Sequence, residues 1–173
     1  PANTQDMSSS IDKQQEALSH EFRKAVANND YNKVQDMIDN SDDKPFDFNA
    51  VNKQGRSAIS YAYQNNDLKM AFMLYHNGAK LDGDELYKHA SIEMRNMLTK
   101  QCEQQRDVAG IDAIMQCINS KDPSNWEDRK KVMSNALEYN RLKQIKEDIV
   151  KENATEKPKI ILSALAAKSG NRE

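Results

Sequence analysis

Side chains that carry out acid–base or nucleophilic chemistry are sparse in this sequence. The three histidines, His20, His76 and His89, are isolated from one another along the chain. The sequence contains no glycine-rich phosphate loop, and no motif places a nucleophile beside a general base. We therefore expect no enzyme activity, no catalytic residue, no cofactor and no small-molecule substrate.

Two acidic stretches raise the question of a calcium site. One holds Asp42 and Asp43, and the other holds Asp82, Asp84 and Glu85. An EF-hand loop requires oxygen ligands at ordered intervals and a glycine at its turn, and neither stretch has that arrangement. The pattern favours charged, solvated loops, and we predict no metal site.

The two cysteines, Cys102 and Cys117, lie fifteen positions apart within predicted helix. Two cysteines without a nearby histidine supply neither a disulfide framework nor the four ligands of a structural zinc site. Cys117 stands in an apolar run, where a thiol packs as a small apolar side chain. The cysteine content therefore favours a reducing compartment, and we predict a cytoplasmic protein.

The charge of the chain is low and evenly distributed, with a formal net charge of -2. Residues 1–100 carry 12 basic and 15 acidic side chains, and residues 101–173 carry 13 basic and 12 acidic ones. Nucleic-acid-binding domains usually have a strongly basic stripe that neutralises phosphates. The densest basic run, residues 129–131, directly follows Glu127 and Asp128, so a solvated helix face explains it better. We expect no nucleic-acid partner.

Signals for membrane insertion or export are also missing. No run of about 18 apolar residues is present, which predicts no membrane span. The residues that follow Pro1 lack the basic and apolar regions of a secretory signal. The absence of an initiator Met indicates processing or a longer native chain.

The elements that would position a binding surface are predicted by an internal repeat. Phe22 stands three positions before Ala25, and Ile59 stands three positions before Ala62. The match continues at the same offset of 37 residues, pairing Asp30 with Asp67, Val34 with Ala71, and Met37-Ile38 with Leu74-Tyr75. Each unit reads as a short helix with a small Ala, a turn, a second helix with apolar residues at 3–4 spacing, and an extended excursion.

The segment from Asn52 to Asp82 resembles a complete ankyrin repeat. Gly55 and Gly78-Ala79 match the family pattern, and Asn52, Ser57, Ile59, Leu81 and Asp82 are conservative matches. Three positions depart from it: Ala58 replaces Pro, Ser60 replaces His, and Tyr63 stands where a second Ala is usual. The resemblance implies that losing the Thr–His hydrogen bonds weakens the turn, and that Tyr63 needs extra room between helices.

Two degenerate units flank this repeat, so the resemblance extends over residues 20–100. The earlier unit carries Ser41 to Pro45 where a Gly-Ala closure is expected, which lengthens a loop. The later unit is shortened, with a first helix over 84–90 and a second over 92–98. In the effectors of intracellular bacteria, ankyrin repeats occur in chains rich in Asn, Gln and Lys, and this composition resembles theirs.

Helical segments flank the repeats on both sides, because an array must seal its ends. Residues 1–19 are predicted as a tail and capping helix, in which Ser8 to Ser10 offer caps. Ile11, Ala17 and Leu18 would lie against the first repeat. Residues 101–168 are predicted as a helical subdomain, and residues 169–173 as a frayed tail. The predicted fold class is all-α.

Within the carboxy-terminal subdomain, apolar residues from Val108 to Ile118 predict a helix that stops at Asn119. A capping box at Ser124 predicts the next helix start. Apolar residues then continue at 3–4 spacing to Val150, as one long helix or as two joined near residues 139–140. Residues 160–167 predict a last apolar helix.

The resemblance implies a partner-binding surface made of finger tips and the exposed ends of inner helices. The residues it selects are Lys53, Gln54 and Arg56 in the finger, Gln64 and Asn65 on the inner helix, and Asn28 in the earlier unit. The alternative is that these are ordinary solvated polar residues. Arg56 stands out because Arg combines stacking with forked hydrogen bonding at interfaces.

Phe72 occupies a position where the family places a charged residue. It either packs on the carboxy-terminal helices of this molecule or anchors a partner, and the first interpretation is favoured.

The function we expect is that of a protein–protein interaction module, an adaptor or inhibitor whose partner is another protein. The alternative is a substrate-recognition fragment of a larger enzyme or of a translocated bacterial effector, which would act in the cytosol of a host cell. Ankyrin repeats fix the shape of a surface and leave specificity to variable residues, so the partner's identity does not follow.

Overall fold

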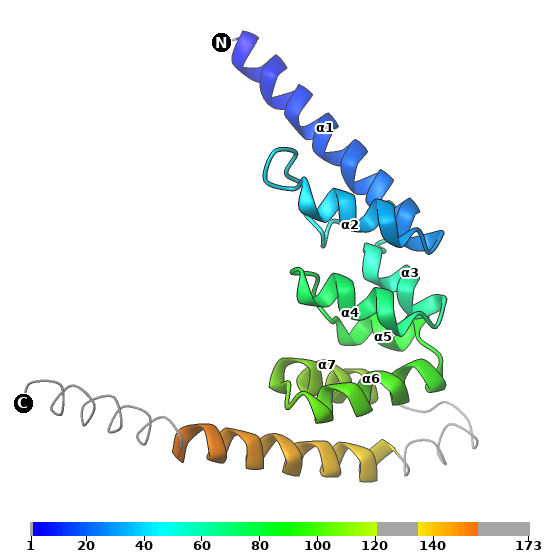
Figure 1. Ribbon diagram of the computed structural model, residues 1–173, viewed down its shortest axis with the longest axis vertical. Coiled ribbons are helices and arrows are strands. Elements are labelled where there is room, and N and C mark those ends of the chain that lie inside the picture. The colour runs from blue at the N-terminus through cyan, green and yellow to red at the C-terminus, as the bar shows by residue number, and fades with distance from the viewer. Residues whose placement is uncertain (1, 121–134, 156–173) are drawn as a thin grey trace, which may run out of the picture. The chain divides into compact units, whose positions relative to one another are not determined.

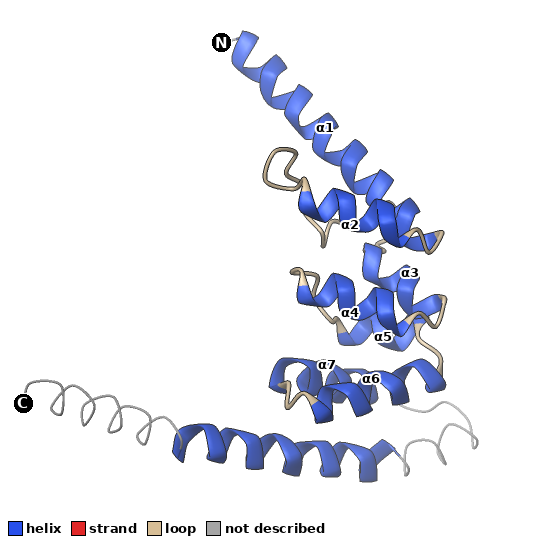
Figure 2. Ribbon diagram, viewed as in Figure 1, coloured by secondary structure: helices blue, strands red, loops and turns tan. Residues whose placement is uncertain are grey.

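The computed structural model describes residues 2–120 and 135–155, and all regular elements in these ranges are helices (Figure 2). The prediction of an all-α fold is confirmed. The labelled helices are α1 (Ala2–Ala27), α2 (Tyr31–Asp39), α3 (Ala58–Gln64), α4 (Leu68–His76), α5 (Gly83–His89), α6 (Ile92–Gln104) and α7 (Val108–Ile118). A further helix runs over residues 135–155. The chain divides into two compact units, Pro1–Lys100 and Gln101–Glu173.

One kind of helix–helix turn recurs in the described residues, at 29–30, 66–67 and 106–107. Its first residue has a left-handed backbone, with φ of 56°, 54° and 55° in chain order. Its second residue is always an Asp, whose amide donates to the carbonyl five residues earlier at 2.9, 3.0 and 2.9 Å. The same Asp accepts from the amide three residues later at 3.2, 3.1 and 3.1 Å. Each turn therefore closes one helix and caps the next.

The core of the first unit is built around a row of inner helices. α1 packs beside α3, and α3 packs beside α5, while α2 packs on α1 and α4 on α3. The small Ala25 and Ala62 are buried in this row. Tyr63 is fully buried, so the extra room that its side chain needs between the helices is present. Val34 and Leu74 bury the inward faces of α2 and α4.

The helix α1 is longer than the sequence predicts. It is continuous over 26 residues, so the predicted capping segment and the first helix of the repeat form one element. Ser8 to Ser10 lie inside α1 and do not cap its start, because no Gly or Pro interrupts the helix after Ala2. Ile11 is 50% exposed and Ala17 is exposed. These two residues are therefore not buried against the first repeat, although both line a cavity with residues 43–45, and Leu18 is half-buried.

The loop of residues 40–57 returns to α1 through an aromatic cluster. Phe22 of α1 is buried, with its ring centroid 4.9 Å from that of Phe46 and 5.2 Å from that of Phe48. Aromatic pairs at such distances add about 0.5–1.5 kcal/mol beyond their burial. The side chain of Asn49 then links this loop to the segment after α4. Its Nδ2 donates to the Gly78 carbonyl at 3.1 Å, and its Oδ1 accepts from the Lys80 backbone amide at 2.8 Å.

The boundaries of the next helices differ modestly from those predicted. α5 and the start of α6 lie within one residue of the predicted helices, but α6 continues six residues past Leu98, to Gln104. No helix breaker stands between Leu98 and the turn at Arg106, which explains the extension.

In the second unit, α7 covers the predicted apolar segment and ends at Asn119 as its C-cap. Gly110 lies so close to Cys102 that an added Cβ would stand 2.6 Å from the Cys102 sulfur. Both cysteines are free thiols and buried, which agrees with apolar packing of Cys117. Burial, with the nearby charges of Asp107 and Glu103, raises the pKa of Cys102 to about 12.

The helix over residues 135–155 is uninterrupted, so the described part of this segment is one helix without a break at 139–140. Leu142 and Ile149 are buried on one face. Ion pairs join this helix to other parts of its unit, namely Arg141 to Glu103 at 2.5 Å, Lys146 to Asp112 at 2.7 Å, and Glu152 to Arg106. The predicted capping box at Ser124, the basic run 129–131, the last helix over 160–167 and the tail lie outside the described residues.

Candidate protein-binding surface

The finger between the two predicted repeats is a closed turn organised by Asn52. The Asn52 amide donates to the Arg56 carbonyl at 3.0 Å, and the Gly55 amide donates to the Asn52 carbonyl at 2.9 Å. The Asn52 side-chain oxygen accepts from the amides of Gln54 and Arg56 at 2.9 and 3.0 Å. Gly55 has a φ of 75°, which a glycine adopts without steric cost. This turn holds Lys53 and Gln54 exposed at its tip.

Arg56 attaches the finger to α3. Its guanidinium carbon lies 3.9 Å from the centroid of the Tyr61 ring, and its Nε and Nη2 donate to the hydroxyl and carbonyl of Ser60 at 3.1 and 3.3 Å. Asn52 donates to the Tyr61 hydroxyl at 2.9 Å. Arg56 is half-buried, so the residue that the sequence selects most strongly as a partner contact has a positioning role within the chain.

Asn65 also makes contacts inside the molecule. Its side-chain amide donates to the Ala27 carbonyl at 3.0 Å and to the Asn29 side-chain oxygen at 3.3 Å, so it joins α3 to the end of α1. The neighbouring Gln64 and Asn28 are exposed. Four of the six predicted residues therefore present exposed side chains without a bond to other described residues, namely Lys53, Gln54, Gln64 and Asn28.

A carboxylate that sequence reasoning assigned to a solvated loop stabilises the start of α3. The Ser57 hydroxyl donates to Glu85 at 2.6 Å, and the Ser57 amide donates to the same carboxylate at 3.4 Å. Negative charge is favourable at a helix amino terminus, so Glu85 stabilises the start of α3. Asp82 likewise caps α5, accepting from the amides of Asp84 and Glu85 at 2.9 and 3.0 Å. Asp82 and Asp84 are exposed, as a solvated loop predicts, whereas Glu85 is half-buried and bonds to Ser57, which lies 28 positions earlier in the chain.

Positive charges gather where the finger meets α5. Burial, together with the charges of Arg56 and Lys88, lowers the pKa of His89 below its ordinary value.

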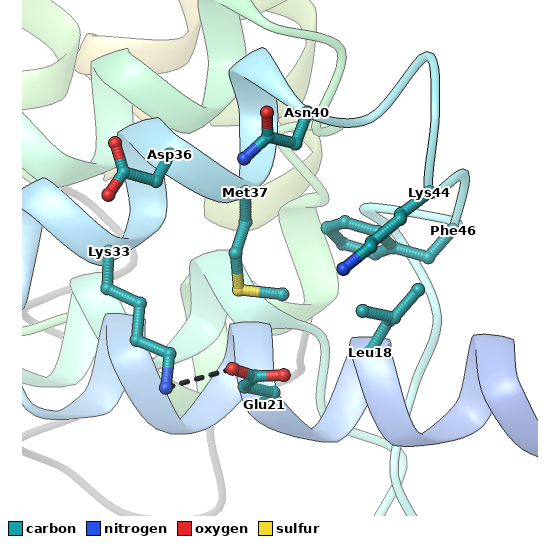
Figure 3. Close-up of a pocket in the computed structure, with 8 residues that line it drawn as sticks. All are labelled: Leu18, Glu21, Lys33, Asp36, Met37, Asn40, Lys44 and Phe46. Carbon is teal, nitrogen blue, oxygen red and sulfur yellow. Dashed lines mark ion pairs between the residues drawn. The ribbon is translucent and has the colours of Figure 1, made fainter.

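A groove that the sequence did not reveal lies between α1 and α2 (Figure 3). A cavity of about 220 Å³ is lined by the apolar side chains of Leu18, Met37 and Phe46 and by the polar or charged ones of Glu21, Lys33, Asp36, Asn40 and Lys44. Glu21 and Lys33 cross its edge as an ion pair of 3.0 Å. A second cavity of about 490 Å³ shares Leu18 and Glu21 and continues along α1. Finding it requires the register of α1 against the loop 41–46, which no local pattern encodes.

Phe72 is half-buried on α4. Its ring meets those of Tyr75 and His76 edge-on, with centroid distances of 6.2 and 5.6 Å. Phe72 therefore belongs to a cluster of three aromatic side chains on α4, together with Tyr75 and His76.

Comparison with known proteins gives no relative for this chain. No model of a protein family, no curated protein and no solved structure matches it. Over residues 2–120 and 135–155, no three side chains of His, Cys, Asp or Glu come together as metal ligands. No helix in those ranges is long and apolar enough to cross a membrane.

Proposed function

We propose that residues 20–100 form ankyrin-type repeats and that this chain is a protein–protein interaction module, an adaptor or inhibitor. The observation that carries the proposal is the finger, where Asn52 fixes the backbone while Lys53 and Gln54 remain exposed. A surface whose backbone is ordered before binding loses little conformational entropy when a partner docks.

The proposed surface continues from the finger across α3. Tyr61 lies under Arg56 and bonds to Asn52, and Gln64 stands one helical turn further on the same face. Asn65 then ties this end of α3 to Ala27, beside the exposed Asn28. The stacked pair of Arg56 and Tyr61 holds the finger against α3 and so supports the exposed Lys53 and Gln54.

The two buried free thiols suit a reducing compartment. We therefore propose that the interaction occurs in the cytoplasm.

The test is affinity capture from cell lysate with the full chain and a triple variant, Lys53→Ala, Gln54→Ala and Gln64→Ala. These substitutions spare Arg56 and Asn65, whose contacts hold the fold. The matched control is Lys100→Ala, Gln104→Ala and Asn96→Ala, which removes similar exposed side chains from α6. The proposal predicts at least one captured protein that the triple variant loses and the control retains. Equal capture of every protein by all three chains rules out this surface.

A further inference from the structure

The groove beside α1 has an apolar floor that the described residues leave open. We define the α1 groove as the two adjoining cavities of about 220 and 490 Å³ between α1 and residues 33–46. Leu18, Met37 and Phe46 are each only half-buried there, and Ile11 is 50% exposed. In Figure 1 the amino-terminal half of α1 extends beyond α2. Apolar side chains gathered in a concave site are typical of a binding groove.

The segment beside this floor is mostly acidic, and its single cation, Lys44, lines both cavities. Segment 36–47 carries five exposed aspartates and one lysine, namely Asp36, Asp39, Asp42, Asp43, Asp47 and Lys44. None of the five aspartates forms an ion pair with the described part of the chain, whereas Lys33 is already paired with Glu21. Asp36 and Asp43 line the groove itself. Complementary charge across an interface speeds association and selects the partner.

We propose that the α1 groove binds a basic segment of a partner protein that carries a large apolar side chain flanked by Lys or Arg. The apolar side chain enters the cavity between Leu18, Met37 and Phe46, which removes apolar area from water. The flanking cations pair with Asp36 and Asp43. This site is separate from the finger, so the chain would hold two proteins and act as an adaptor.

The probe is a fluorescein-labelled synthetic peptide in which lysines flank a single leucine, and binding to the full chain is measured by fluorescence anisotropy. The proposal predicts saturable binding in the micromolar range. One control peptide has the leucine replaced by serine, and another has the lysines replaced by glutamates. Both should bind at least about tenfold more weakly, a change of about 1.4 kcal/mol.

Variants of the protein assign this binding to the groove. Ile11→Glu should weaken it at least about tenfold, whereas Leu137→Glu, at a side chain that is 74% exposed elsewhere, should leave it unchanged. Asp36→Asn combined with Asp43→Asn should weaken binding and reduce its dependence on salt. The control for this pair is Glu93→Gln with Glu147→Gln. All these positions are exposed, and circular dichroism verifies that each variant is folded.

Three results would overturn the proposal. The first is absence of peptide binding, or equal binding of the serine peptide, which would leave only unspecific charge attraction. The second is equal loss of binding in Ile11→Glu and Leu137→Glu. The third is self-association of the wild type in sedimentation equilibrium that Ile11→Glu abolishes, because a second copy would then occupy the groove. The finger variants should not alter peptide binding, so this test is independent of the proposed finger surface.

Discussion

The turns at Asn66 and Arg106 share a backbone but use their side chains differently. Asn66 accepts a hydrogen bond of 2.8 Å from the Ser91 hydroxyl, as Asn29 accepts one from Asn65. Arg106 instead forms an ion pair with Glu152 in the helix over residues 135–155. In each turn the side chain of the left-handed residue thus bonds to a further element. A neutral amide does so within the first unit, and a charge does so within the second.

The packing beneath the two turns differs as well, and this difference predicts the largest effect. Beside the turn at Arg106, Cys102 packs against Gly110. At the turn of Asn66 the corresponding positions hold Ala62 and Met70. Gly110→Ala places a methyl group against the Cys102 sulfur, and overpacking of this kind costs about 1–3 kcal/mol. Urea denaturation should show the loss. Adding Cys102→Ala should restore part of it, and a double variant no more stable than Gly110→Ala contradicts the proposed contact.

The capping aspartates provide the next comparison. Asp67 caps α4 and also accepts from the Tyr31 hydroxyl, whereas the Asp107 side chain, among the described residues, accepts only the capping bond of α7. Losing a cap costs about 1 kcal/mol and losing a further hydrogen bond about as much again. Asp67→Ala should therefore lower the free energy of unfolding by about twice as much as Asp107→Ala. Equal losses in thermal denaturation would show that the Tyr31 contact adds nothing.

Glycine substitutions at the two left-handed positions Asn66 and Arg106 should differ in their effect on stability. Glycine adopts positive φ without strain, while a residue with a side chain pays about 1 kcal/mol there. Asn66→Gly also loses the bond to Ser91, worth about 0.5–1.5 kcal/mol, so its net effect should be near zero or destabilising. Arg106→Gly loses only an exposed ion pair, worth about 0–1 kcal/mol, and should be neutral or stabilising. Destabilisation of Arg106→Gly beyond that of Asn66→Gly would reverse the comparison.

The smallest effect at neutral pH concerns Tyr31. Its hydrogen bond to Asp67, with burial and the charge of that carboxylate, raises the pKa of Tyr31 from 10.0 to about 12. The folded protein retains this proton more tightly than the unfolded chain, so the contribution is complete below pH 10 and is lost as the pH rises toward 12. Asp67→Asn should lower the pKa of Tyr31, as measured by phenolate absorbance against Tyr31→Phe. An unchanged titration would exclude Asp67 as the cause.

Much of the first unit was predictable because its signals are local and in phase. The offset of 37 residues pairs Asn29-Asp30 with Asn66-Asp67, and both turns have the expected form. The third turn escaped recognition because it lies 40 residues further on, with Arg106 in place of Asn and Cys102 in place of Ala. Its Asp107 was the only signal left, and a single Asp between apolar segments is too common to identify a turn.

The candidate site was predictable only in part, for a physical reason. Exposure of Lys53 and Gln54 follows from a turn at Gly55, which the sequence displays. The internal roles of Arg56 and Asn65 depend on which neighbouring atoms lie within hydrogen-bond distance, and Glu85 acts on Ser57 across 28 positions. Contacts of that kind are set by how the repeats stack, and no local pattern encodes them.

The length of α1 also affects how fast its backbone amides exchange with solvent. At 26 residues the helix is about 39 Å long, while α2, at nine residues, covers only about 14 Å of it. Amides near the buried Phe22 and Val26 exchange with solvent only when α1 separates from α2 and α3. Amides before Ile11 rely on helix propensity and exchange far sooner. One unbroken helix thus contains both slowly and rapidly exchanging amides. A protein that docks in the α1 groove would slow the exchange of the rapid ones.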